Sequence, residues 1–186
     1  MLAVGFLVGA LMAGGCGGDD EEPQGGGQQQ AEGAIEGTGY SFVPPDGWRD
    51  AAEAFEGSAI RVDAAYAEPE PQDGFANNVN VIRESPEGLD PDRLDDYVQE
   101  FRKQAGTLAT DAGLTETEET ELDGEPARTY TYESREPEQP RIRQQQVVVI
   151  HEDAIYTLTW SARRDTFEQS QAQLQRLLDS WRWSSR

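Results

Sequence analysis

Apolar and polar residues alternate along several short stretches of the chain, and this period of two predicts half-buried β-strands. The first stretch, Tyr40-Ser41-Phe42-Val43, leads into a turn built on Pro44, Pro45 and Gly47, which ends at Trp48. We expect seven strands in all, over residues 40–43, 60–66, 75–84, 114–122, 126–133, 142–151 and 154–161.

Two segments instead repeat their apolar residues at the spacing of an α-helix. The first follows Asp90, which can cap the helix, and Pro91, which suits the first helical position. The second begins at Asp165, which has capping-box spacing with Glu168. We interpret both apolar stripes as core faces. They comprise Leu94, Tyr97, Val98 and Phe101 in the first helix, and Phe167, Leu174, Leu177, Leu178 and Trp181 in the second.

The turns indicate how the strands pair. Asp123-Gly124 is a strong signal for a two-residue hairpin, and Glu152-Asp153 predicts a second hairpin. We expect the closing residues 181–183 to pack back on the sheet. The predicted strands follow one another in groups, and the helices are separate from them. This order predicts an α+β fold. The predicted architecture is an antiparallel sheet of about six to seven strands packed with two main helices, in one domain over residues 38–186.

This order of elements resembles the PsbP-like family (Mog1/PsbP fold), which includes small actinobacterial lipoproteins of the LpqN type. The resemblance covers about residues 38–184. It implies a binding or assembly protein rather than an enzyme, and it supplies no family active site. It rests on Gly39-Tyr40-Ser41-Phe42, Pro45-Asp46-Gly47-Trp48, Asn78-Val79-Asn80-Val81, Leu122-Asp123-Gly124-Glu125-Pro126-Ala127 and the closing helix with Trp181.

The N-terminus resembles the signal peptide of a bacterial lipoprotein. An apolar run from Leu2 to Ala13 is too short to span a bilayer and is followed by Gly14-Gly15-Cys16. We expect residues 1–15 to be removed by cleavage between Gly15 and Cys16, and Cys16 to be lipidated. The alternatives are that residues 1–15 belong to the folded domain, or that Cys16 is an ordinary thiol.

Residues 16–37 are rich in Gly, Gln and acidic side chains, and we expect them to form a flexible tether. The lipid at Cys16 would hold the protein on the outer face of the cytoplasmic membrane, in the cell envelope. Two or more acyl chains give stable retention, whereas a single chain gives only marginal anchoring.

The chain is strongly acidic, with 36 Asp plus Glu against 15 Lys plus Arg and a net charge of −21. A nucleic-acid partner is therefore excluded, because phosphate binding needs a basic surface. Cys16 is the only cysteine, so the domain contains no disulfide. Lys103 is the only lysine, which is typical of a GC-rich genome such as that of an actinobacterium.

Residues with catalytic or metal-binding chemistry are few, and we expect no catalytic site, metal or cofactor. His151 is the only histidine and follows a valine-rich strand, where we expect a turn or edge position. Two acidic groups have other interpretations. Asp90, Asp92, Asp95 and Asp96 either attract Ca²⁺ or form a solvated helix N-terminus, which we favour; Glu116, Glu118 and Glu121 predict the exposed face of an edge strand.

These observations favour a non-catalytic accessory factor that binds or helps assemble an envelope protein. A candidate interaction surface is the open face of the sheet together with Trp48, Pro44 and Pro45. The alternative for Trp48, which we favour, is a core position beside the turn. The alternative to an accessory factor is a carrier of a small apolar or lipid ligand, held between the sheet and the helices.

Overall fold

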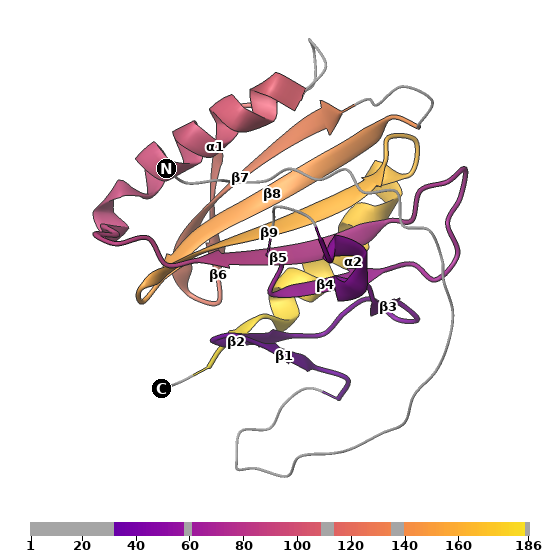
Figure 1. Cartoon of the computed structure of the whole chain (residues 1–186), viewed down its shortest axis with the longest axis horizontal. Helices are drawn as coiled ribbons and strands as arrows, with labels where there is room; N and C mark the ends of the chain where they lie inside the picture. Colours follow the sequence, from indigo (N-terminus) through magenta and orange to yellow (C-terminus); the bar gives the residue numbers. More distant parts are fainter. Residues whose placement is uncertain (1–31, 58–60, 109–113, 135–139, 185–186) are drawn as a thin grey trace.

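A computed structural model describes residues 32–57, 61–108, 114–134 and 140–184. Its centre is a seven-stranded antiparallel sheet (Figure 1), so the predicted α+β fold is confirmed. Across the sheet the strands are β3 (Arg49–Asp50), β4 (Ala64–Ala67), β5 (Asn78–Glu84), β9 (Ala154–Arg163), β8 (Ile142–His151), β7 (Glu125–Ser134) and β6 (Glu118–Leu122).

A second, three-stranded sheet joins the two ends of the described chain. Its order is β1 (Ile35–Gly37), β2 (Tyr40–Phe42) and β10 (Arg182–Trp183). The closing residues therefore pack back as expected, although they pair with β2 rather than with the large sheet. Residues 35–37, which the sequence places in the tether, form β1, because β2 offers them a partner.

Two α-helices cover opposite faces of the large sheet (Figure 1). The helix α1 (Leu94–Leu108) packs with Val148 and Ile150 of β8, whereas α2 (Phe167–Ser180) packs with Val149. Adjacent residues of a strand point to opposite faces, so the two helices lie on different sides. Short 3-10 helices, η1 (Ala52–Phe55) and η2 (Pro91–Arg93), precede β4 and α1.

Local signals in the sequence account for most of the element ends. The Asp90 carboxylate accepts a hydrogen bond from the Asp92 amide at 3.1 Å, which confirms the predicted cap. Asp123 and Gly124 have φ angles of 46° and 84°, as the predicted two-residue hairpin requires. Pro126 is the second residue of its strand, where a missing N–H is tolerated.

Several details of the prediction are wrong. The strands predicted over residues 75–84 and 114–122 begin only at Asn78 and Glu118. Asp165 does not cap the second helix: Thr166 occupies the N-cap position, and its side chain makes no capping hydrogen bond. The carboxylate of Asp165 is instead bound by Arg163. The strand predicted over residues 60–66 begins at Ala64, after a segment that connects η1 to the sheet; Ile60 lies outside the described residues.

The larger core lies between the sheet, α2 and the small sheet, and aromatic rings dominate it. Trp181 stacks on Tyr40 with ring centroids 4.3 Å apart, and Tyr40 meets Tyr156 edge to face at 5.7 Å. The smaller core lies under α1, where Val98 and Phe101 pack on Tyr130 and Tyr132. The predicted apolar stripes of both helices are therefore core faces.

Candidate functional site

The lipidation site lies beyond the part of the chain that the structure describes. Gly15, Cys16 and residues 17–31 of the expected tether all precede residue 32, the first described residue. The cleavage and the lipid therefore stay predictions.

Trp48 lies against the core rather than on an open surface. Its ring stacks on Trp160, with centroids 4.8 Å apart and planes at 19°, on the face of the sheet that α2 covers. The Trp48 amide donates to the Pro45 carbonyl at 3.1 Å and closes the turn. Pro44 and Pro45 are half-buried, and Asp46 and Gly47 form the exposed tip.

His151 is the last residue of β8 and precedes the turn to β9, as predicted. Its Nδ1 lies 3.0 Å from a carboxylate oxygen of Glu125, and its ring stacks on Trp183. Glu125 is the first residue of β7, and Trp183 belongs to the C-terminal strand β10. The position of the histidine is explained by this packing.

Three of the four aspartates at the start of the first helix make structural contacts through their carboxylates. Asp90 caps the helix, Asp96 binds Arg93 at 2.8 Å, and Asp95 binds Arg128 at 2.7 Å. Within the described ranges, no group of three or more His, Cys, Asp or Glu side chains is arranged to hold a metal ion. The contacts of Asp90, Asp95 and Asp96 agree with the interpretation of these acids as a helix N-terminus and a solvated face.

The acidic residues before the Asp123 turn lie where the sequence predicts them. β6 is the last strand at one side of the sheet, and its Glu118, Glu119 and Glu121 are exposed. Glu116, just before the strand, is exposed as well. Charged side chains on an edge strand discourage pairing with another chain.

The sequence analysis missed a row of uncharged polar side chains on the sheet. These residues alternate along three neighbouring strands, and cross-strand pairing brings them to one face, the face that α1 covers in part. We call them the polar strip: Asn78 and Asn80 of β5, Gln144 and Gln146 of β8, and Thr157, Thr159 and Ser161 of β9, all buried. Their alternation with apolar residues is visible in the sequence, but the partner strands are not.

Hydrogen bonds link the polar strip across the strands. Gln144 Nε2 donates to Ser161 Oγ at 2.9 Å, and Gln146 Nε2 donates to Thr159 Oγ1 at 3.4 Å. Tyr130 donates its phenol proton to Gln146 Oε1. Burial raises the pKa of Tyr130, so this phenol stays protonated and acts as a donor.

The strip still has unused hydrogen-bonding capacity. Among the described residues, Gln144 Oε1 is buried without a hydrogen-bond partner, and the hydroxyl of Ser134, at the end of β7, is in the same state. Buried polar atoms are satisfied in the great majority of cases, so each exception calls for an explanation.

A cavity of about 1020 Å³ lies beside η1 and the turn between β1 and β2. Charged side chains make up about half of its lining: Arg61, Arg83, Asp50, Glu53, Glu56 and Asp63, beside the apolar Phe55 and Val62. Asp63 is already bound by Thr38, whose amide and hydroxyl donate to it at 2.8 and 2.6 Å. This opening does not suit an apolar ligand, because pockets for such ligands are lined mainly by apolar side chains.

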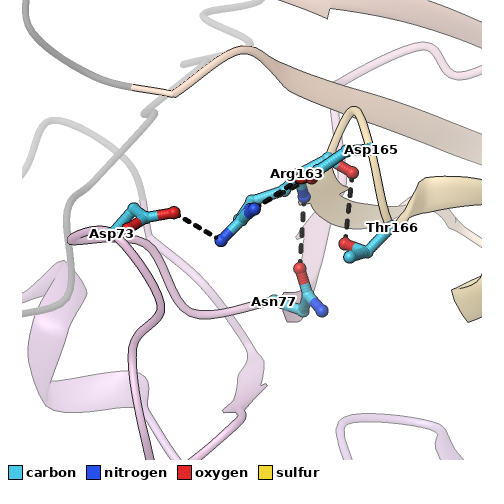
Figure 2. A network of polar contacts seen from close by, with 5 residues as sticks. All are labelled: Asp73, Asn77, Arg163, Asp165 and Thr166. Atoms are coloured by element: carbon cyan, nitrogen blue, oxygen red, sulfur yellow. Dashed lines mark hydrogen bonds and ion pairs between the residues drawn. The ribbon is translucent and has the colours of Figure 1, made fainter.

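A smaller cavity of about 360 Å³ lies between α2 and the segment before β5, next to a network centred on Arg163 (Figure 2). Arg163 binds Asp73 at 2.8 Å and Asp165 at 2.5 Å, and its backbone N–H donates to the side chain of Asn77 at 3.2 Å. The guanidinium lowers the pKa of Asp165. Because two carboxylates already neutralise Arg163, this network ties the end of β9 to the segment before β5 rather than offering a free cation.

Two solved structures have a fold similar to that of this chain. LpqN of Mycobacterium tuberculosis, whose structure is described as involved in cell envelope biogenesis, is similar with a TM-score of 0.58 and 15% identity, over 78% of this chain and 83% of that chain. The cyanobacterial PsbP of Synechocystis is similar with a TM-score of 0.61 and 18% identity, over 88% of this chain and all of that chain (100%). At these identities the likeness shows the fold alone.

A search of the curated proteins found no match. A family model described as PsbP matches residues 35–183, which is most of the chain and includes every described strand and helix. The matched range also begins at β1, in agreement with the start of the fold. The chain therefore belongs to the PsbP family.

Proposed function

We propose that this protein is a membrane-anchored, extracytoplasmic lipoprotein that acts as a non-catalytic binding or accessory factor of the cell envelope. The observation that carries the proposal is the order of three segments along the chain. An apolar run ending at Cys16 and an acidic, Gly- and Gln-rich segment precede a PsbP-type domain that begins at residue 35. A lipid at Cys16 and a flexible tether would let such a domain reach a partner at the membrane.

The fold neighbours add support for the envelope. LpqN, which shares the fold, is described as involved in cell envelope biogenesis. No helix among the described segments has the length and apolar character needed to cross a membrane.

A carrier of an apolar ligand has less support. The two cavities described above are lined mainly by charged and polar side chains. The apolar side chains between sheet and helices are themselves close-packed, and Trp160 and Trp181 are completely buried. We therefore favour a protein partner over a stored lipid.

The anchor is tested by feeding radiolabelled palmitate to cells that express the wild type or Cys16→Ala. We expect label in the wild type only, and the variant should be released from the membrane fraction. Equal labelling of both proteins would refute the anchor.

The partner is tested by crosslinking in living cells, with Cys16→Ala as the control. We expect one envelope protein to be enriched with the lipidated form. We also expect Asp46→Arg, at the tip of the turn that contains Pro44, Pro45 and Trp48, to reduce its yield. Glu87→Arg is the matched control, since it reverses a charge at another exposed position. An unchanged yield for Asp46→Arg would exclude this turn from the interface.

A further inference from the structure

The cavity beside η1 contains opposite charges that do not pair with one another. Glu53 lies in η1, Glu56 directly follows it, and Arg61 lies between η1 and β4. All three residues are exposed and line the cavity. Among the residues that the structure describes, none forms an ion pair or a side-chain hydrogen bond with any of the three. One cation and two anions therefore share the same opening and are available to a ligand.

The other two acidic side chains of the lining are already engaged. Both carboxylate oxygens of Asp63 accept hydrogen bonds from Thr38. The Asp50 carboxylate accepts a hydrogen bond from the Ala52 amide at 2.8 Å, at the start of η1. These acids therefore belong to the fixed wall of the cavity.

The second arginine of the lining is part of the same wall. Arg83 Nε donates to the Tyr156 hydroxyl at 3.2 Å, and its guanidinium pairs with Asp153 at 3.3 Å. The Tyr156 hydroxyl in turn donates to the Thr38 carbonyl at 3.0 Å. Arg83 is therefore held in place, whereas the Arg61 guanidinium has no such partner.

The cavity also has an apolar side. Phe55 and Val62 line it, and both are partly buried against the alanines of β4. Its volume of about 1020 Å³ lies at the upper end of the usual range for ligand pockets, roughly 300–1,000 Å³. The space suits a ligand larger than a single amino acid, with apolar parts as well as charges.

We propose that this cavity binds a short peptide with free ends. The Arg61 guanidinium would bind the terminal carboxylate, because its planar donors match a carboxylate in charge and shape. Glu53 and Glu56 would bind the terminal ammonium, and the apolar side of the cavity would contact the side chains between the two ends. A ligand with only one kind of charge is disfavoured, because it would leave one of the available groups without a partner and face a like charge.

This inference goes beyond the proposed function and does not depend on the anchor. Peptide binding would belong to the folded domain, whereas membrane attachment would belong to Cys16. The Cys16→Ala variant should therefore lose membrane retention and keep peptide binding. The two proposals can fail separately.

The test is a titration of the ¹⁵N-labelled full chain in detergent, followed by protein NMR. The probes are trialanine, alanyl-leucyl-alanine and alanyl-phenylalanyl-alanine with free ends, at millimolar concentration. We expect at least one of them to shift the amides of residues 52–57 and 61–63. Its N-acetylated and C-amidated forms should each bind about tenfold more weakly, because each lacks one of the two charges.

Variants assign each end of the peptide to its partner. Arg61→Gln should weaken binding of the free peptide by about tenfold, and C-amidation should then cause no further loss. The double variant Glu53→Gln/Glu56→Gln should likewise weaken binding and remove the effect of N-acetylation. The matched controls are Arg176→Gln and Glu87→Gln, which change exposed residues outside this cavity and should bind like the wild type. Thermal unfolding of each variant separates lost binding from lost folding.

Any of three results would overturn the proposal. The first is that none of the free-ended tripeptides shifts the spectrum. The second is that the blocked forms, or free alanine, bind as tightly as the free-ended peptide. The third is that Arg61→Gln and the double glutamate variant, while folded, bind as tightly as the two controls.

Discussion

The imidazole of His151 stacks on the indole of Trp183, with ring centroids 4.2 Å apart and planes at 11°. His151 is the last residue of β8 in the large sheet, and Trp183 is the last residue of β10 in the small sheet. The stack therefore joins the C-terminal strand to the large sheet. The indole N–H also donates to the Leu122 carbonyl at 3.1 Å, and the Trp183 amide donates to Asp123 at 2.9 Å. The chain end is thus held by ring packing and by hydrogen bonds together.

The first prediction concerns this chain end. We expect Trp183→Ala to lower the free energy of unfolding by about 2 kcal/mol, less than for a fully buried tryptophan, since Trp183 is only partly buried. Urea unfolding followed by circular dichroism measures the change. Trp183→Phe keeps a ring against His151 and should recover part of the loss; a null effect for Trp183→Ala would show that β10 does not contribute to stability.

The second prediction compares two glycines with left-handed backbones. Gly39 has φ +89°, and a Cβ there would lie 2.7 Å from the Tyr156 hydroxyl oxygen; Gly47 has φ +78° with open space around it. Gly47→Ala should cost about 1 kcal/mol from the backbone alone, and Gly39→Ala about 2–3 kcal/mol because Tyr156 must also move. Equal losses in urea unfolding would contradict the close approach of Gly39 to Tyr156.

The third prediction tests the Arg163 network. Arg163→Met should lower the midpoint of thermal unfolding by about 3 °C, because Asp73 and Asp165 lose their common partner. Arg164→Met is the control: this neighbouring arginine is exposed and pairs with Glu133 at 3.1 Å, so the change should be within about 1 °C. A similar loss for both variants would contradict a special role for Arg163.

The same network predicts a pH dependence. Arg163 lowers the pKa of Asp165 in the folded state from its ordinary value of 3.8. The lowered pKa stabilises the fold above pH about 4, and the contribution disappears as the pH falls through the folded pKa. The difference in thermal midpoint between the wild type and Asp165→Asn should therefore be constant near neutral pH and shrink in acid. A difference that stays constant in acid would refute the ion pair.

The fourth prediction concerns Glu84, at the end of β5. Burial raises the pKa of this carboxyl above 4.5, so ionisation opposes folding. The destabilisation is absent below pH about 4.5 and is complete once the pH exceeds the folded pKa. Glu84→Gln should therefore increase stability at pH 7 by about 0.5 kcal/mol and leave it unchanged in acid. Lower stability of the variant at pH 7 would show that the carboxylate makes a favourable contact.

Several features of the fold could be read from the sequence because neighbouring residues decide them. Alternating apolar positions predicted β8 and β9 almost to the residue. Asp123-Gly124 predicted the tight hairpin, since few residues adopt two successive positive φ angles. Asp90 and Pro91 predicted where the first helix begins, because a cap depends on amides within three residues.

Other features depended on residues far apart in the chain. The sequence places residues 35–37 in a tether, but pairing with β2 makes them a strand. The spacing of Asp165 and Glu168 fits a capping box, yet a charged guanidinium two residues earlier binds the aspartate more strongly than a backbone amide does.

The position of Trp48 was also decided by residues far apart in the chain. The sequence leaves Trp48 either on an interaction surface with the open face of the sheet or, as we favour, in the core. The structure puts its ring on Trp160, on the face opposite the polar strip.

The sequence by itself determined the period of each strand, the turns, the acidic balance and the order of elements, because these depend on local sterics and on composition. The tertiary structure alone decided which strands are neighbours. It thereby brought Asn80, Gln146 and Thr159 into one row across the sheet, although Asn80 and Thr159 are about 80 residues apart along the chain. The physical reason is that cross-strand register is fixed by the packing of the whole sheet between its helices, and no local pattern encodes it.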